Sequence, residues 1–168
     1  MKNKINYQKG DVITASKDVV KNNDNLNIII PHICNNEGKW GKGFVKALSK
    51  EFPECERIYK RDIEYKINNN FSTLGTISIC HSENYKIHIF NMIAQKLYVK
   101  TPIRYSALVE CMNNINILIK NNGSEKKYKI YAPMFGSGLA GGNWEFIQRL
   151  IWEIWIEKYN LDVTIFQL

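Results

Sequence analysis

The sequence lacks several features that define common protein classes. No window reaches 18 uninterrupted apolar residues, so we expect no membrane span and a cytoplasmic location. No two of the four cysteines form a CxxC pair and no HExxH motif occurs, so we predict no metal site. The same spacing argues against a secreted disulfide framework, and we expect all four thiols to be reduced. They are Cys34, Cys55, Cys80 and Cys111.

Arginine is also scarce, because 19 of the 23 basic residues are lysines. No dense basic run with interleaved aromatic residues is present, which argues against a nucleic-acid-binding surface. The net charge of +7 is consistent with an anionic partner. An alternative origin is an A/T-rich genome, since Asn, Ile and Lys together supply 63 of the 168 residues.

The 168 residues predict a single domain spanning residues 1–168, with no linker and no internal repeat. Apolar residues alternate or recur at helical spacing in ten segments. Strands are expected at 5–8, 27–34, 74–80, 86–92, 128–134 and 163–167, and helices at 44–52, 55–63, 105–119 and 143–154. This order predicts an α/β fold, a three-layer α/β/α sandwich with a mixed, mainly parallel sheet.

Ligands of such sheets bind beyond the carboxyl ends of the strands, which here are the loops after Cys34 and Met134. The second loop, Gly136 to Gly141, fits GxGxxG. It does not predict a dinucleotide-binding domain, because only one strand follows it and Asp162 stands at the start of that strand. Its glycines favour close approach to a phosphate or a sugar hydroxyl. A tight turn that needs glycine only for its shape is the alternative.

The first loop holds a second glycine cluster, Gly38-Lys-Trp-Gly41-Lys-Gly43-Phe44, directly before an expected helix. It is not a Walker loop, because no Gly-Lys pair is followed by Ser or Thr. Backbone amides at a positive helix end favour anions. Two such loops are therefore expected to close on a diphosphate from two sides.

Polar residues near these loops have a functional and a structural interpretation. Asn35 and Asn36 can serve sugar hydroxyls or form an Asx turn. Asp11 can accept from the exocyclic amine of adenine, or act as a turn or cap residue. His32 and Cys34 share one face of an apolar strand, where core packing is the expectation rather than a nucleophile pair.

Four segments in this order resemble a macrodomain. They are Asn6-Tyr-Gln-Lys-Gly-Asp11-Val-Ile, Pro31-His-Ile-Cys-Asn35-Asn36 with the first glycine cluster, Met134-Phe-Gly136-Ser-Gly138-Leu-Ala-Gly-Gly142-Asn-Trp144, and Val163-Thr-Ile-Phe-Gln-Leu168. The resemblance is greatest to the branch with the terminal ADP-ribose protein glycohydrolase, the macrodomain antitoxins that de-ADP-ribosylate DNA, and the yeast ADP-ribose 1″-phosphate phosphatase.

This resemblance implies an ADP-ribose pocket in which Asp11 holds the adenine amine and the two glycine loops hold the diphosphate and the distal ribose. The implied ligand-binding residues are Asp11, Val12, Ile13, Asn35, Asn36, Trp40, Gly41, Lys42, Gly43, Phe44, Gly136, Ser137, Gly138, Leu139, Ala140 and Leu168. The residues expected at the reacting sugar are Asn35, Gln95 and Lys96.

Two positions depart from the glycohydrolases of that branch. Ala140 stands where they have an acid, and Ala94 and Gln95 stand near the place of their attacking lysine, with Lys96 one position later. We therefore expect a water molecule, positioned against the distal ribose, to act in place of a lysyl intermediate.

The expected function is hydrolysis of the ADP-ribosyl linkage of a modified protein or polymer, or of O-acetyl-ADP-ribose. The alternatives are a non-catalytic reader of ADP-ribose and an ADP-ribose 1″-phosphate phosphatase. No cofactor is expected. The expected partner is an ADP-ribosylated macromolecule, a protein rather than a nucleic acid. The protein is expected to be a monomer and not to bind a membrane.

Overall fold

The computed structural model describes residues 4–123 and 125–168, so residues 1–3 and 124 of the expected domain lie outside the described residues. In this described part of the chain, six strands form one sheet in the order β1-β6-β5-β2-β4-β3. Neighbouring strands are parallel except for the antiparallel pair β3–β4, which confirms the mixed, mainly parallel sheet. The strands are β1 (Asn6–Lys9), β2 (Leu26–Asn35), β3 (Ile77–His81), β4 (Ile87–Gln95), β5 (Lys127–Pro133) and β6 (Asp162–Gln167).

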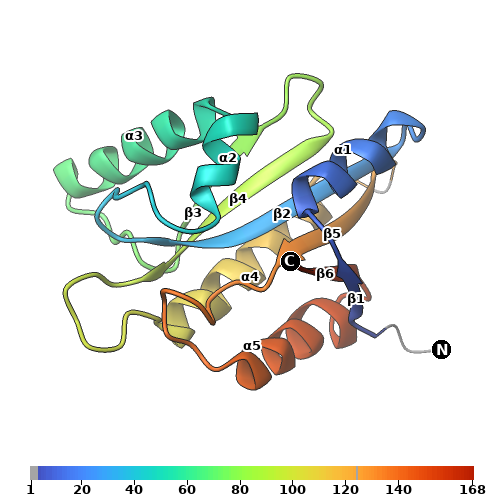
Figure 1. Cartoon of the computed structure of the whole chain (residues 1–168). Coiled ribbons are helices and arrows are strands. Elements are labelled where there is room, and N and C mark those ends of the chain that lie inside the picture. Colours follow the sequence, from blue (N-terminus) through green and yellow to red (C-terminus); the bar gives the residue numbers. More distant parts are fainter. Residues whose placement is uncertain (1–3, 124) are drawn as a thin grey trace.

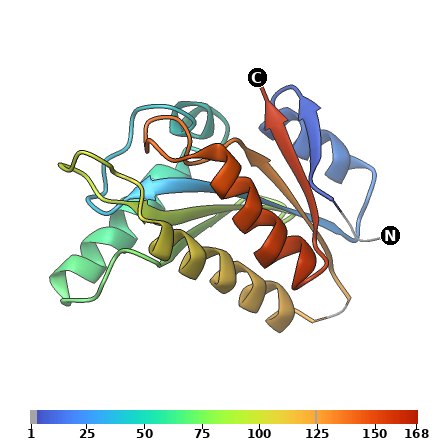
Figure 2. The same cartoon turned by 90° about the horizontal axis from the view of Figure 1, so that it is seen from below.

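Helices cover both faces of this sheet (Figure 1). They are α1 (Val12–Lys21), α2 (Val45–Glu51), α3 (Glu54–Asn68), α4 (Tyr105–Asn121), α5 (Trp144–Ile151) and its π-helical continuation η1 (Trp152–Glu157). Figures 1 and 2 place α1, α2 and α3 on one side, and α4 and α5 on the other. The expected three-layer α/β/α sandwich is confirmed.

Strand β2 explains why both faces need a helical layer. Ile28 and Ile30 point into the core beneath α1 and α2, whereas Ile29 points into the core beneath α4 and α5. All three side chains are buried, as expected for a central parallel strand with a continuous apolar run.

Helix α1 corrects the expected element order, which had no helix between the first two strands. Asp11 caps it by accepting a hydrogen bond from the Thr14 amide at 2.7 Å. Its apolar face buries Val12, Ile13 and Val20. The Asp cap and the four-residue spacing from Val12 to Ser16 favour this helix.

The expectation of four reduced thiols is also wrong. Cys55 at the start of α3 and Cys80 on β3 form a disulfide, whereas Cys34 and Cys111 are free and buried. No local pattern indicates this pair, because the two cysteines come together only when α3 packs on β3. Among the described helices, none combines the length and the apolar character that a membrane span requires.

Candidate functional site

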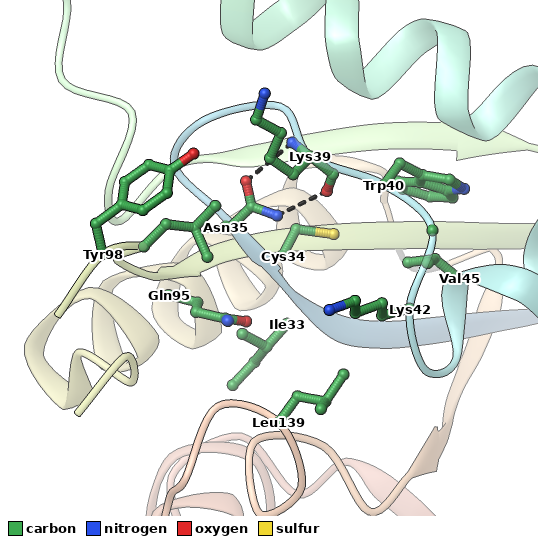
Figure 3. Close-up of a pocket in the computed structure, with 12 residues that line it drawn as sticks. Ile33, Cys34, Asn35, Lys39, Trp40, Lys42, Val45, Gln95, Tyr98 and Leu139 are labelled. Carbon is green, nitrogen blue, oxygen red and sulfur yellow. Dashed lines mark hydrogen bonds between the residues drawn. The ribbon is translucent and has the colours of Figure 1, made fainter. Parts of the chain in front are cut away.

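Two adjoining cavities of about 660 and 260 Å³ lie at the carboxyl ends of β2, β4 and β5. Together they form a cleft between the two glycine loops, here called loop 1 (residues 36–44) and loop 2 (residues 134–143). The larger cavity is shown in Figure 3. The two cavities share Ile33, Lys42, Val45, Gln95 and Leu139. This is the edge of the sheet at which open α/β folds bind ligands.

The side chain of Asn35 organises the first half of loop 1. Its Oδ1 accepts hydrogen bonds from the Glu37 and Lys39 amides, each at 3.0 Å, and its Nδ2 donates to the Lys39 carbonyl at 2.6 Å. The Tyr59 hydroxyl on α3 donates to the Asn35 carbonyl at 2.6 Å. The Asx-turn interpretation therefore describes this amide well, although one Nδ2 hydrogen remains for a ligand. Its neighbour Asn36 accepts from the Leu97 amide and lies outside the cleft lining.

Aromatic packing holds the second half of loop 1 in place. The Trp40 indole donates to the Ser49 hydroxyl at 2.7 Å and packs against Tyr59, with ring centroids 5.4 Å apart. Phe44 meets the buried His32 ring edge-on at 5.4 Å. These contacts fix Gly41 to Gly43 between two anchored rings.

Loop 2 depends on glycine for a close approach to the core. A Cβ atom at Gly136, where φ is +81°, would lie 2.8 Å from the Ile33 side chain and 2.9 Å from that of Ile147. Gly138 differs, because its φ is not in the left-handed region and a Cβ atom there would meet nothing within 4 Å. A side chain at Gly138 would extend into open space in the cleft without disturbing the fold.

Backbone N–H groups without a described partner lie on both sides of the cleft. The N–H groups of residues 41–45 and 136–140 donate to no described residue. Lys39 and Lys42 also line the cleft, and neither forms an ion pair with a described residue. No Asp or Glu is among the described residues that line it. Free N–H groups and unpaired ammonium groups together favour an anion such as a diphosphate.

The buried pair His32 and Cys34 does not provide a nucleophile. Burial lowers the pKa of His32 to about 4, and raises the pKa of the Cys34 thiol far above its ordinary value. The His32 Nε2 pairs with the Asn91 Oδ1 at 2.5 Å, and the Cys34 Sγ lies 3.8 Å from the His32 Nδ1. Because a reactive cysteine needs its thiolate, these residues support the cleft wall, as the core-packing interpretation predicts.

The predicted site residues fall into two groups in the structure. Most line the cleft: Asn35, Trp40, Gly41, Lys42, Gly43, Phe44, Gln95, Gly136, Gly138, Leu139 and Ala140. The others do not line it: Asp11, Val12, Ile13, Asn36, Lys96, Ser137 and Leu168.

Asp11 and Leu168 lie together at the same edge of the sheet, since β1 pairs with β6 and the Gly10 amide donates to the Gln167 carbonyl. The Asp11 side chain is exposed, and its capping bond to Thr14 uses only one carboxylate oxygen. Val12 and Ile13 are buried core residues on the face of α1 that packs against the sheet.

Gln95 and Lys96 differ in position although they are adjacent in sequence. Gln95 lines both cavities and extends toward Ile33 from the side opposite Lys42 (Figure 3). Lys96 is exposed outside the lining, and its amide donates to the Pro102 carbonyl. The last residue of β4 therefore reaches the cleft, whereas its successor points elsewhere.

Sequence reasoning missed two polar residues of the lining, Lys39 and Tyr98. Lys39 lies within the first glycine cluster, so its neighbouring glycines could have indicated that it lines the cleft. Tyr98, which is 84% exposed, lies on the loop after β4, and no local pattern marks it as a rim residue.

Comparisons with known proteins give two kinds of relatives, although no family model matches. An uncharacterized 17.5 kDa protein of Enterobacteria phage T4 is 30% identical over 88% of this chain and 87% of its own length. An ADP-ribose 1″-phosphate phosphatase of Candida albicans is 26% identical over 95% of this chain and 99% of its own length.

Solved structures share the fold along almost the whole chain. A Bacteroides thetaiotaomicron protein of unknown function is 34% identical, with a TM-score of 0.81 and 98% of both chains covered. A macrodomain protein of Streptomyces coelicolor is 27% identical, with a TM-score of 0.75, covering 98% of this chain and 99% of its own. The chain therefore has the fold of a macrodomain and is similar along nearly its whole length to a macrodomain protein and to an ADP-ribose 1″-phosphate phosphatase.

Proposed function

We propose that the protein binds ADP-ribose in the cleft and hydrolyses the linkage that joins its distal ribose to a modified substrate. The diphosphate lies between loop 1 and loop 2, the adenine lies toward Asp11, and the distal ribose lies in the larger cavity beside Asn35 and Gln95. The modified substrate extends past Tyr98 into solvent.

One observation supports this proposal most strongly. Two rows of backbone N–H groups without a described partner, residues 41–45 and 136–140, flank a cleft that also holds Lys39 and Lys42. Such donors suit two linked phosphates better than a single carboxylate, because they approach from two sides of the cleft. The Candida relative and a second yeast relative are both named as phosphatases of an ADP-ribose derivative, which supports ADP-ribose as the diphosphate-containing ligand.

The reaction uses water as the nucleophile. With a modified protein or polymer, the water oxygen bonds to the anomeric carbon of the distal ribose, the bond to the modified group breaks, and that group takes a proton from the water. With O-acetyl-ADP-ribose, the water oxygen bonds to the acetyl carbonyl carbon, the ester C–O bond breaks, and the ribose oxygen takes the proton. With no Asp or Glu among the described lining residues, catalysis rests on positioning and electrostatics. Gln95 positions the ribose and the water, while Lys42 balances the charge of the diphosphate.

A phosphatase acting on ADP-ribose 1″-phosphate is the second candidate, because relatives of nearly full length carry that name. The same cleft would hold the nucleotide, and water would attack phosphorus in place of carbon. A reader that binds ADP-ribose without turnover is the third candidate, and the absence of a carboxylate among the described lining residues favours it.

A turnover panel separates these candidates. Wild-type protein is incubated with ADP-ribosylated protein, ADP-ribosylated DNA, O-acetyl-ADP-ribose and ADP-ribose 1″-phosphate, with Gly138→Glu as the blocked control. Release of ADP-ribose from modified protein or acetylated sugar is the expected result. Release of phosphate alone would identify the phosphatase, and binding without any turnover would identify the reader.

A further inference from the structure

A third cavity, of about 320 Å³, lies at the opposite end of the sheet from the cleft, where β2, β4 and β5 begin. Here called the rear cavity, it opens beside the turn between β3 and β4 and the C-terminal end of α4. Its apolar walls are Ile29, Ile79, Phe90, Leu118 and Ile119. Its volume is at the lower end of the range of about 300 to 1,000 Å³ that is typical of small-molecule sites.

Four aromatic rings form one side of the rear cavity in an unbroken series. Tyr85 lies against His81 with ring centroids 5.4 Å apart and planes 35° apart. His81 meets His88 edge-on at 5.0 Å, and His88 lies 6.0 Å from Tyr128. Tyr85 holds a φ of +53°, a conformation that costs a non-glycine residue free energy. These rings favour a flat aromatic ligand, which can stack or meet them edge-on.

The two histidines form a polar chain that ends at this cavity. The Asn27 Oδ1 lies 3.0 Å from the His88 Nε2, and the His88 Nδ1 lies 2.7 Å from the His81 Nδ1. If His88 donates to Asn27, its Nδ1 accepts from the His81 Nδ1–H, which fixes the direction of both bonds. The His81 Nε2 has no partner among the described residues. It is therefore available to a ligand.

The charge of the rear cavity is positive. Lys126 lines it and forms no ion pair with a described residue, and no Asp or Glu is among its described lining residues. The hydroxyl of Tyr128 accepts from the Asn122 Nδ2 at 3.1 Å, which leaves the Tyr128 O–H as a further donor. A ligand with an anionic group thus finds an ammonium and a hydroxyl donor near the mouth.

We propose that the rear cavity is a second binding site, specific for a small planar aromatic carboxylate. The ring of the ligand lies against Tyr85, His81 and the apolar wall, and its carboxylate faces Lys126. This site does not depend on the function proposed for the cleft, because the two lie at opposite ends of the parallel strands.

The test is an NMR titration of the full chain with three probes: benzoate, benzamide and cyclohexanecarboxylate. Benzoate should shift the His81 and His88 resonances saturably, and more tightly than either benzamide, which lacks the charge, or cyclohexanecarboxylate, which lacks the flat ring. Lys126→Gln should weaken benzoate binding by roughly two- to fivefold, the effect of one exposed ion pair, and Lys120→Gln should not.

A pair of tryptophan variants tests the location. Leu118→Trp should fill the rear cavity and abolish the shifts, whereas Ile117→Trp, at an exposed position on the same helix outside the lining, should preserve them. Absence of saturable shifts in the wild type up to about 10 mM, a range that covers fragments of ordinary ligand efficiency, would overturn the proposal. Equal binding of all three probes, or binding unchanged by Leu118→Trp, would overturn it as well.

Discussion

Single residues of the site differ in how far their roles follow from local sequence. Asn143, where a helix was expected to begin, caps α5 by accepting a hydrogen bond from the Phe146 amide three residues later, so the contact is local. Asn35 also forms its bonds within four residues, but its loop is completed by Tyr59, 24 residues away. Sequence could therefore suggest the Asx turn at Asn35 but not that Tyr59 would support it.

Asp11 allows a test of adenine recognition that leaves α1 intact. Asp11→Ser retains a side-chain oxygen to cap Thr14 and removes the carboxylate oxygen that the cap does not use. Because a hydrogen bond to a charged group is worth about 1.5 to 3 kcal/mol, ADP-ribose affinity should fall roughly 10- to 150-fold in calorimetry.

The ligand comparison for Asp11 uses GDP-ribose, whose base has a carbonyl in place of the amine. Wild-type protein should bind GDP-ribose much more weakly than ADP-ribose, and Asp11→Ser should narrow the difference. Equal affinity of the wild type for both nucleotides would show that Asp11 only caps the helix.

Gln95 and Lys96 form a natural pair of variants, since only the first lines the cleft. Gln95→Ala should lower kcat roughly 100-fold, the cost of misplacing reacting groups, with a small change in ADP-ribose affinity. Lys96→Ala should retain most turnover. A covalent adduct trapped on Lys96, or loss of turnover in Lys96→Ala with binding intact, would contradict the water route.

Among the elements, α4 was predictable because its apolar residues recur at helical spacing, and β2 and β4 because each is a long, mostly apolar segment that the sheet buries on both faces. Helix α1 was not predicted, because its segment of 10 residues is short and begins with two β-branched residues, which have a low helix propensity. The disulfide between α3 and β3 is a tertiary contact, which no local pattern encodes.

The disulfide should stabilise the folded protein, because it links two cysteines 25 residues apart and so restricts the unfolded chain. Constraint of the unfolded chain predicts a loss of about 3 kcal/mol in the free energy of unfolding for Cys55→Ser, measured by urea denaturation. Without reductant, the unfolded wild type should expose only the thiols of Cys34 and Cys111 to a thiol reagent. Labelling of all four cysteines under those conditions would contradict the pairing.

At the scale of the whole molecule, the three-layer arrangement buries two histidines that must stay neutral. Burial is the main cause that lowers the pKa of His32 and of His88 to about 4 from 6.5. Between these values the unfolded chain binds more protons than the folded chain. The free energy of unfolding is therefore highest above about pH 6.5 and falls as the pH drops toward 4.

Urea denaturation at about pH 7 and pH 5 measures this effect, which amounts to at most about 2 kcal/mol for each histidine over that interval. His32→Gln cannot gain the proton, so its loss of stability between the two pH values should be smaller than that of the wild type. An identical loss in both proteins would show that His32 does not contribute.

The fold and the edge of the sheet that holds the cleft followed from the order of the elements and from two glycine clusters. The exact lining did not, because Lys39, Tyr98 and Gln95 meet only after β2 and β4 pair with a shift in register at Asn35. A one-residue difference at the end of β4 decides whether Gln95 or Lys96 reaches the cleft, and such register is set by packing rather than by local pattern.

Calorimetric titration of ADP-ribose into the wild type, Gly138→Glu and Ser106→Glu tests the assignment of the cleft most directly. Gly138 has open space around it, so a glutamate there should leave the circular dichroism spectrum unchanged and place a carboxylate between the loops. Ser106→Glu adds the same charge at an exposed position of α4 outside the cleft lining. The predicted result is saturable binding to the wild type and Ser106→Glu, and no binding to a folded Gly138→Glu. Unchanged affinity in folded Gly138→Glu would contradict the placement of the diphosphate between the two glycine loops.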